Sequence, residues 1–361
     1  MNVPTKLQVL EQYFGYASFR PGQEDLIDAL LRGQDVVGVM PTGAGKSLCY
    51  QVPALLMEGV TLVVSPLISL MKDQVAALVQ NGVRGAYLNS SLTWGQYQKA
   101  LRNARAGLYK IIYVAPERLL TPEFLDFAQS VEVSMVVIDE AHCVSQWGQD
   151  FRPSYLDIPD FVGKLPRRPV VSAFTATATP RVRRDILSLL RLRHPFVNVT
   201  SFDRPNLYFE VRRPKDKLQE LFALLEPRRE KSGIVYCATR KGVEEVCTAL
   251  GERGFAATRY HAGLSDQERQ KNQEDFLYDR ATVMVATNAF GMGIDKSNVS
   301  FVIHYNMPKD LESYYQEAGR AGRDGQPAEC FLLYSGQDVS LARFLLAHSE
   351  EGQDLDPRAQ E

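Results

Sequence analysis

Short runs of β-branched and other apolar residues recur along the chain and alternate with longer amphipathic stretches. One such stretch, residues 23–31, places four apolar side chains on one helical face and stops at Gly33. This alternation is typical of parallel βα units, whose strands are buried on both faces. The runs in the first half that predict strands are residues 36–39, 61–65, 111–115, 136–139 and 170–175.

The same rhythm restarts after about residue 205 and predicts a second α/β lobe. Before it, residues 201–206 combine turn-forming side chains with the rigid Pro205, which indicates a linker. The predicted fold class is therefore α/β, with lobe 1 at residues 1–200 and lobe 2 at residues 207–345. We expect the acidic, polar tail at residues 346–361 to be disordered. The strands predicted for lobe 2 are residues 233–237, 256–260, 283–286, 301–305 and 330–334.

Length and composition support this division. A chain of 361 residues favours two domains over a single core. Its hydrophobic share of 45% and charged share of 23% are typical of a soluble globular protein, and it contains no run of about eighteen apolar residues. Residues 1–19 lack the uninterrupted apolar core of a secretion signal. We therefore expect no membrane segment. The expected location is the cytoplasm, at the nucleoid, if the protein is bacterial, and the nucleus if it is eukaryotic.

Cysteine spacing bears on whether zinc is bound, and net charge bears on how a nucleic acid could bind. The five cysteines are scattered, and no pair has the spacing of a zinc site, so we expect reduced thiols and no zinc. The formal net charge is −2, but residues 349–361 hold five acids and one arginine, so they contribute −4 and leave +2 on the remainder. A nucleic-acid partner would therefore bind in a local groove rather than across a basic surface.

Residues 40–47 read Met-Pro-Thr-Gly-Ala-Gly-Lys-Ser, after a predicted strand and before a helix-compatible stretch. This is the context of a phosphate-binding loop, although Met40 stands where the general pattern has its first glycine. Small residues let backbone N–H groups approach phosphate oxygens, Lys46 can reach the β- and γ-phosphates, and Ser47 can ligate Mg²⁺. A plain glycine-rich turn is the alternative. The predicted nucleotide-binding residues of this loop are Thr42, Gly43, Ala44, Gly45, Lys46 and Ser47.

A second candidate lies where a later apolar strand ends in Asp139, Glu140, an alanine and His142. Carboxylates at the carboxyl end of a parallel strand point into the ligand crevice. We expect Asp139 to hold Mg²⁺ through water and Glu140 to polarise the attacking water as a general base. We include His142 among the candidate catalytic residues. Such an acidic pair alone is more often a solvated surface feature, but the upstream phosphate-binding loop favours the catalytic interpretation.

The second half contains residues 316–323, Gln-Glu-Ala-Gly-Arg-Ala-Gly-Arg. Arg320 and Arg323 are three apart, which predicts positions near one helix face. Arginine can stabilise charge on a transferring phosphoryl group, so these two and Gln316 are candidate catalytic residues. The two glycines would be costly in an ordinary helix, and we interpret them as allowing close approach to a ligand. A surface arginine pair is the alternative.

These blocks occur in the order and spacing of superfamily 2 helicases, and the chain resembles a RecQ DNA helicase over about residues 10–344. The resemblance implies two tandem RecA-like lobes, with parallel sheets flanked by helices and a site for ATP and Mg²⁺ in the cleft between them. Its narrowest marker is residues 14–23, which resemble the adenine-recognition block of that family. There Tyr16 and Arg20 would sandwich the base, and Gln23 would bond its edge.

A second family marker, residues 143–153, follows the acidic box directly. Trp147 and Phe151 lie among glycine and polar residues and beside Arg152, a setting poorly suited to a buried core. Exposed aromatic rings beside an arginine can stack with single-stranded bases. In RecQ-like proteins this aromatic-rich loop couples DNA binding to ATP hydrolysis. Packing of the loop against the partner lobe is the competing interpretation.

Further blocks resemble motifs that contact the nucleotide or the DNA backbone. In residues 65–74, Lys72 would position phosphates without reading sequence. Residues 174–178 resemble the small-hydroxyl motif that links the ATP site to lobe movement. The candidates that the resemblance adds in the second lobe are Arg240, His261 and Asn288 for DNA and Asp295 for the nucleotide.

The resemblance implies an ATPase that travels 3′→5′ on single-stranded DNA and unwinds partly duplex DNA in repair and recombination, as a monomer. Neither polarity nor the choice of DNA over RNA is visible in the motifs themselves. Three alternatives stay open: an RNA helicase, a binding scaffold with a dead ATP site, and a P-loop kinase or transporter ATPase without the second lobe. Because full-length RecQ proteins usually continue with a zinc subdomain and a winged helix, we expect a motor core that holds duplex DNA weakly.

Overall fold

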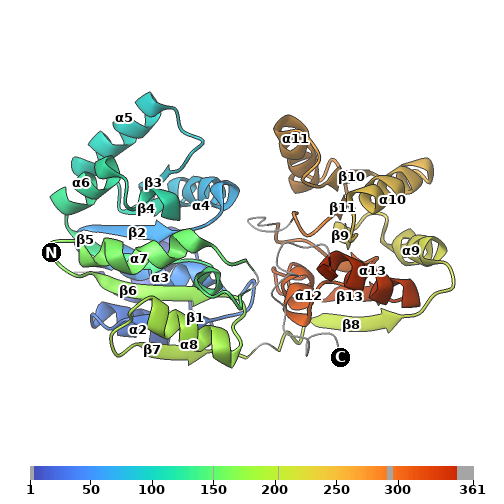
Figure 1. Cartoon of the computed structure of the whole chain (residues 1–361), viewed down its shortest axis with the longest axis horizontal. Helices are drawn as coiled ribbons and strands as arrows, with labels where there is room; N and C mark the ends of the chain where they lie inside the picture. Colours follow the sequence, from blue (N-terminus) through green and yellow to red (C-terminus); the bar gives the residue numbers. More distant parts are fainter. Residues whose placement is uncertain (1–3, 149, 202, 291–295, 348–361) are drawn as a thin grey trace. The chain divides into compact units, whose positions relative to one another are not determined.

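The computed structural model describes residues 4–148, 150–201, 203–290 and 296–347. The chain divides into two compact units, residues 1–202 and residues 203–361. Each unit is built on one parallel β-sheet with helices packed against it (Figure 1). Within the described ranges, no helix is both long enough and apolar enough to cross a membrane.

Unit 1 alternates strands and helices along the chain. Its strands are β1 (Val36–Val39), β2 (Val60–Val64), β3 (Gly85–Leu88), β4 (Ile111–Val114), β5 (Val133–Ile138), β6 (Val170–Thr175) and β7 (Phe196–Val199). Its α-helices are α1 (Lys6–Phe14), α2 (Gln23–Leu31), α3 (Lys46–Leu56), α4 (Ile68–Gln80), α5 (Trp94–Arg105), α6 (Pro122–Ser130), α7 (Ile158–Gly163) and α8 (Pro180–Leu189). Three 3₁₀ segments are η1 (Pro116–Arg118), η2 (Ala141–Val144) and η3 (Pro153–Asp157).

The strand order of unit 1, β3-β4-β2-β5-β6-β1-β7, determines which loops meet. Val39 at the end of β1 pairs with Thr175 at the end of β6, and Val64 of β2 pairs with Ile138 of β5. The carboxyl ends of these four parallel strands therefore meet at one edge of the sheet, where ligands bind in folds of this type.

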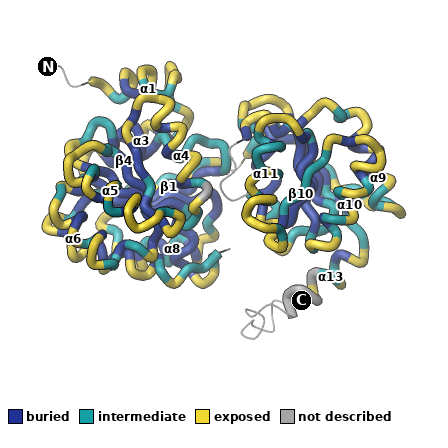
Figure 2. The backbone as a smooth tube through the Cα atoms, turned by 90° about the horizontal axis from the view of Figure 1, so that it is seen from above, coloured by how far each residue is buried: buried dark blue, intermediate teal, exposed yellow. Residues whose placement is uncertain are grey.

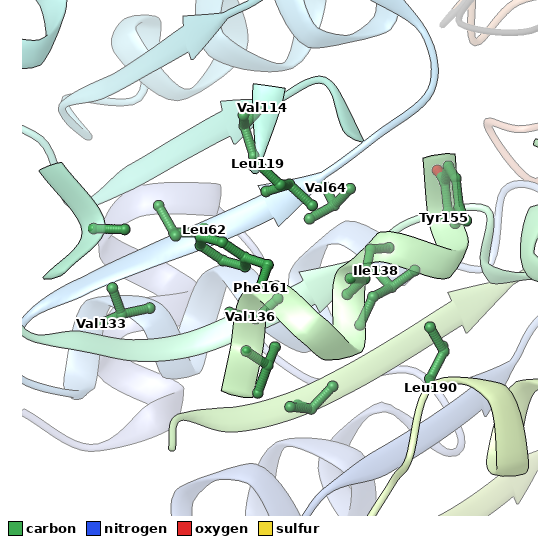
Figure 3. Packing of buried hydrophobic residues seen from close by; sticks show 14 of the residues in the cluster. Leu62, Val64, Val114, Leu119, Val133, Val136, Ile138, Tyr155, Phe161 and Leu190 are labelled. Atoms are coloured by element: carbon green, nitrogen blue, oxygen red, sulfur yellow. The ribbon is translucent and has the colours of Figure 1, made fainter. Parts of the chain in front are cut away.

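The central strands of unit 1 are buried on both faces. Along β5, Val136 and Ile138 pack into one apolar cluster, and Met135 and Val137 pack into the cluster on the opposite face. Figure 3 shows the first cluster, in which Phe161 from α7 lies over the strands. Burial on both faces explains why β5 reads as a continuous apolar run rather than an alternating one.

Unit 2 repeats the architecture with a six-stranded sheet. Its strands are β8 (Leu207–Arg212), β9 (Gly233–Tyr236), β10 (Ala257–Tyr260), β11 (Val283–Ala286), β12 (Phe301–His304) and β13 (Ala328–Leu333), in the order β10-β11-β9-β12-β13-β8. The helices are α9 (Lys217–Leu225), η4 (Glu226–Arg228), α10 (Arg240–Glu252), α11 (Asp266–Leu277), α12 (Leu311–Ala318) and α13 (Gly336–Ala347). Figure 2 shows that the strands form the buried interior of each unit.

The predicted α/β class with two parallel-sheet lobes is confirmed. Every predicted strand exists, although β5 begins at Val133, three residues before the predicted start. The pattern missed β3, β7 and β8, all of which lie at sheet edges. Two of them, β7 and β8, expose part of their apolar side chains, as Val197 and Val211 do, so their hydrophobic signal is weaker.

Candidate nucleotide site and nucleic-acid surface

The phosphate-binding loop connects β1 to α3, which begins at Lys46. Gly45 caps the helix in the left-handed conformation, with φ at 76°, and Gly43 has φ at 82°. A β-carbon on Gly45 would lie 2.5 Å from Nε2 of Gln23, so both conformation and space require glycine there. A helix N-terminus favours anions, which makes residues 42–47 a suitable cradle for phosphate.

The predicted adenine block lies directly against this loop. Gln23 is 1% exposed, its Nε2 donates to the carbonyls of Ala44 and Gly45 at 3.0 Å each, and its Oε1 accepts from the Arg20 N–H at 2.8 Å. The Arg20 guanidinium donates to a third carbonyl of the loop. Gln23 therefore holds the phosphate-binding loop, a role that the sequence interpretation missed. Its contact with adenine stays a prediction, as does stacking on the half-exposed ring of Tyr16.

Asp139 follows β5 and lies within electrostatic range of Lys46. Burial, and next the charge of Glu140, raise the pKa of Asp139 to about 7 against the opposing charge of Lys46. Ser65, at the end of β2, donates to Asp139 Oδ2 at 3.5 Å. A bound divalent cation would favour the ionised form of such a buried carboxyl, so Asp139 fits the predicted Mg²⁺ role.

Ser47 is the other predicted Mg²⁺ residue, at the second position of α3. In the part of the chain that the structure describes, no three His, Cys, Asp or Glu side chains gather to hold a metal ion. Mg²⁺ in nucleotide sites is commonly bound by one or two protein oxygens together with phosphate oxygens and water. Asp139 and Ser47 suit that arrangement rather than an all-protein site.

Glu140 and His142 belong to the acidic box, and His142 connects it to β6. Glu140 is a non-glycine residue with left-handed backbone, φ 48° and ψ 49°, a strained conformation of the kind that clusters at functional sites. His142 Nδ1 lies 2.9 Å from Thr175 Oγ1, and that hydroxyl donates to the Thr177 carbonyl at 2.9 Å. The Thr175 proton is thus committed, so Nδ1 of His142 donates. Burial lowers the pKa of His142, which favours the neutral ring.

The aromatic loop leaves Trp147 55% exposed. The guanidinium carbon of Arg181, from α8, lies 3.4 Å from the centroid of the Trp147 ring. The Trp147 backbone N–H donates to Ser145 Oγ at 3.2 Å, and that hydroxyl donates to Asp185 Oδ2 at 2.6 Å. The exposed ring is therefore held against α8 by the guanidinium stacked on it, and the loop backbone is joined to α8 through Ser145, as a base-stacking surface would need.

Arg152 ties the same loop to the start of the block that contains Lys72. Its Nε and Nη2 donate to Asp150 at 2.9 and 2.8 Å, and its Nη1 donates to the Pro66 carbonyl at 3.1 Å. Phe151 is half-buried, whereas Lys72 is exposed on α4. Lys72 is thus open to a phosphate, while Arg152 is held within the protein.

The structure corrects the interpretation of residues 316–323. Helix α12 ends at Ala318, so Arg320 and Arg323 lie in the turn beyond it and not on a helix face. Gly322 has φ at 58°, and a β-carbon there would lie 2.5 Å from Asn206 Nδ2. This glycine is required by contact with the protein itself rather than with a ligand. Its carbonyl accepts from Asn206 Nδ2 at 2.9 Å.

Arg320 is 6% exposed and approaches the buried Tyr236. Burial raises the pKa of Tyr236 to about 12, and the Arg320 charge and hydrogen bond oppose that rise. The Tyr236 hydroxyl donates to the Phe290 carbonyl at 3.0 Å. A neutral tyrosine thus connects the arginine turn with the loop after β11. Gln316, on α12, is half-buried.

Of the predicted DNA contacts in unit 2, Arg240 is exposed at the start of α10. His261 is 6% exposed, and its Nδ1 accepts from the Gly263 N–H at 3.1 Å. Its Nε2 therefore carries the proton and donates to Glu244 at 2.8 Å. Both ring nitrogens are bonded inside unit 2, which suits a supporting role better than a direct DNA contact.

Asn288 is exposed and helps to line a pocket of about 320 Å³ within unit 2. The pocket lies at the carboxyl ends of β9 and β12, and His304 and Glu317 line it, bonded to each other at 2.9 Å. Sequence patterns gave no sign of this buried pair, since neither residue belongs to an obvious ligand spacing. The predicted nucleotide contact Asp295 lies outside the described residues.

Comparison with known proteins identifies the family. Residues 20–186 match the DEAD/DEAH box helicase family, and residues 216–325 match the helicase conserved C-terminal domain. The chain is 49% identical over 343 residues to the ATP-dependent DNA helicase RecQ of Bacillus subtilis, covering 95% of this chain and 58% of that protein. It is 43% identical to the probable ATP-dependent DNA helicase RecS of the same organism, covering 93% of this chain and 68% of RecS. The chain belongs to the RecQ helicase family.

A RecQ helicase of Pasteurella multocida is 48% identical over 97% of this chain, which spans 55% of that relative. The chain therefore spans a little over half the length of the RecQ relatives that it matches.

Solved structures confirm the fold of two RecA-like lobes. Mycobacterium smegmatis helicase Lhr bound to single-stranded DNA and AMP-PNP has a TM-score of 0.73 at 20% identity, covering 96% of this chain and 50% of Lhr. Saccharomyces cerevisiae Dbp5 bound to RNA and ADP BeF3 has a TM-score of 0.71 at 18% identity, covering 98% and 93%. At these identities the likeness establishes the fold alone.

Proposed function

We propose that the chain is the motor of a RecQ DNA helicase, which hydrolyses Mg-ATP to move 3′→5′ along single-stranded DNA and separate duplexes. The observation that supports this most directly is that Asp139, which follows β5, lies within electrostatic range of Lys46 at the start of α3. The pKa of Asp139 is raised to about 7 by burial even though Lys46 opposes the rise. A buried carboxyl next to a phosphate-binding loop suits a nucleotide-bound cation better than a structural role.

In this proposal each residue of the unit 1 site has a separate role in ATP hydrolysis. Lys46 and the loop amides neutralise the phosphates, and Ser47 and Asp139 hold Mg²⁺, which supplies charge stabilisation when bound. Glu140 accepts a proton from water as the water oxygen bonds the γ-phosphorus and the bond to the β-phosphate oxygen breaks. Arg320 and Arg323 of unit 2 would stabilise charge on the transferring group.

DNA would contact exposed groups, whereas buried ones position them. Trp147 offers a stacking face, and Lys72, Arg240 and Asn288 offer donors to the phosphate backbone. We assign Arg152 a supporting role, because its guanidinium is already bonded to Asp150 and the Pro66 carbonyl. His261 supports unit 2 in the same way through Glu244 and Gly263.

The test is steady-state ATP hydrolysis with and without single-stranded DNA, together with strand separation on duplexes that carry a 3′ or a 5′ tail. We expect DNA to stimulate hydrolysis, and unwinding to require the 3′ tail. Lys46→Ala should abolish turnover without unfolding the protein, while Lys164→Ala, at an exposed site away from the loop, should not. Persisting turnover in Lys46→Ala would refute the phosphate-loop assignment.

Two further outcomes decide between the rival functions. Equal or stronger stimulation by RNA of matched sequence would favour an RNA helicase. Absence of any ATP hydrolysis would favour a binding scaffold. A protein that acts on chromosomal DNA belongs at the nucleoid or in the nucleus, and we propose that it works as a monomer, which sedimentation at working concentration would check.

A further inference from the structure

Helix α8 contributes two side-chain contacts to the aromatic loop, from Arg181 and Asp185, although neither residue belongs to a motif singled out in the sequence. Arg181 covers one face of the Trp147 ring at 3.4 Å. Asp185, four residues further on and therefore on the same face of the helix, accepts from Ser145, which in turn accepts from the backbone N–H of Trp147. One helix face thus holds both the ring and the backbone of the loop.

The same helix is rigidly placed. Val182 and Ile186 are about 1% and 0% exposed and belong to the main apolar cluster of unit 1. Its N-cap, Thr179, accepts from the Val182 N–H and follows Thr177 by two residues. The Thr177 carbonyl accepts from Thr175, and the Thr175 hydroxyl also bonds His142. Helix α8 therefore begins directly after a segment that contacts the acidic box.

We propose that Arg181 is a positioning residue for DNA: its guanidinium backs one face of the Trp147 indole and leaves the opposite face for an unpaired base. The inference deepens the proposed function and rests on it, because it concerns the strand that the motor follows. Helix α8 would then connect base stacking on Trp147 with ATP hydrolysis at the acidic box. It carries Arg181, and it continues from the Thr175–Thr177 segment, which contacts that box.

Exposure and chemistry both favour a backing role. Trp147 remains 55% exposed even though Arg181 lies over its ring, so a second face is open to solvent. A guanidinium over an indole is attracted to the ring and is planar, which restricts the ring to one orientation. Bases of any type stack on an indole that is held in this way, which suits movement along DNA without sequence preference.

Tryptophan emission can test this without ATP. The chain has two tryptophans, and Trp94→Phe, at an exposed site on α5, leaves Trp147 as the single emitter. In that background we compare Arg181→Gln with Arg184→Gln, titrating each with an oligothymidylate. Arg184 is exposed on the same helix, so both variants lose one positive charge, but only Arg181 covers the Trp147 ring.

We expect Arg181→Gln to change Trp147 emission before DNA is added. Relative to Arg184→Gln, it should raise the DNA concentration for half-maximal quenching about two- to fivefold, the range that loss of an exposed cation–π contact gives. The DNA concentration for half-maximal ATPase stimulation should rise to the same extent, with basal turnover unchanged. Arg181→Lys, which retains a cation, should restore part of the loss.

Equal values for the two glutamine variants would overturn the proposal, because Arg181 would then be one surface charge among several. Tighter DNA binding by Arg181→Gln would also overturn it, since the guanidinium would be competing with the base. DNA-stimulated ATPase without any change in Trp147 emission would refute the stacking role and leave the motor function standing. Quenching by DNA without stimulated hydrolysis would support the stacking role and count against the motor.

Discussion

The side-chain amide of Gln23 lies so close to Gly45 that position 45 has no room for a side chain. Gln23 Nε2 donates to the Gly45 carbonyl at 3.0 Å, and a β-carbon on Gly45 would lie 2.5 Å from the same nitrogen. A second bond from Nε2 reaches the Ala44 carbonyl at 3.0 Å. Gln23 thus binds the carbonyl side of the phosphate-binding loop and fixes its shape before nucleotide arrives.

Gln23→Ala is expected to raise KM for ATP about tenfold or more with a small effect on kcat, because two hydrogen bonds of about 0.5–1.5 kcal/mol each are lost. Steady-state hydrolysis over a range of ATP and GTP concentrations checks this. If Gln23 acts through the loop, both KM values rise together, whereas a contact with the adenine edge alone would affect ATP. Gln129→Ala is the control, since Gln129 donates one bond to the Lys164 carbonyl away from the loop.

Asp139→Asn should abolish ATP hydrolysis and yet raise the melting temperature of the nucleotide-free protein. The ordinary pKa of this carboxyl, 3.8, rises to about 7 on folding. Between those values the folded state holds a proton that the unfolded state releases, so Asp139 costs stability progressively as pH rises from about 4 to 7. Asparagine carries no charge and removes this cost.

Thermal unfolding at pH 8 and at pH 5 measures the effect of Asp139→Asn. The gain should be larger at pH 8, with about 2–4 °C for each kcal/mol recovered. Mg²⁺ with ADP should stabilise the natural chain more than the variant. An unchanged melting temperature at both pH values would show that the carboxyl is not destabilised by burial.

Much of the fold and of unit 1's site could be predicted from local pattern. Runs such as residues 170–175 are apolar because both sheet faces are covered, and residues 40–47 carry their chemistry in consecutive positions. The contacts that join these segments could not be predicted. His142 meets Thr175 only because β5 and β6 are neighbours in the sheet, and Gln23 meets Gly45 only after α2 packs on α3.

The sequence interpretation was wrong where the backbone conformation, and not the residue composition, determines the structure. The helical reading of Arg320 and Arg323 assumed that α12 continues, but Gly322 adopts positive φ and its carbonyl is held by Asn206, more than a hundred residues earlier in the chain. Arg181 escaped notice because a lone arginine on a helix has no sequence signature. The role of Arg181 follows only from its contact with the Trp147 ring, which the sequence does not reveal.

Thr175→Val should separate ATP hydrolysis from DNA-dependent movement. The substitution keeps the shape of the side chain but removes the hydroxyl that accepts from His142 and donates to the Thr177 carbonyl. We expect basal hydrolysis to fall modestly and strand separation per ATP to fall about tenfold, measured side by side on one tailed duplex. The control is Thr61→Val on β2, where the buried hydroxyl makes no hydrogen bond among the described residues, so no loss is expected. Proportional loss of both rates in Thr175→Val would contradict the coupling role.

Tyr236→Phe should lower kcat for ATP several-fold and leave KM for ATP nearly unchanged. The hydroxyl donates to the Phe290 carbonyl at 3.0 Å and contacts Arg320, and because burial raises its pKa to about 12 it remains a neutral donor over the whole working range of pH. Phenylalanine keeps the ring and its stacking with His304, so only the placement of Arg320 should suffer. An arginine that acts on the transferring phosphoryl group is needed in the transition state more than in binding, which is why kcat is the sensitive quantity. Tyr208→Phe, at an exposed site on the edge strand β8, should leave both constants unchanged. A rise in KM with kcat intact would instead assign Tyr236 to nucleotide binding.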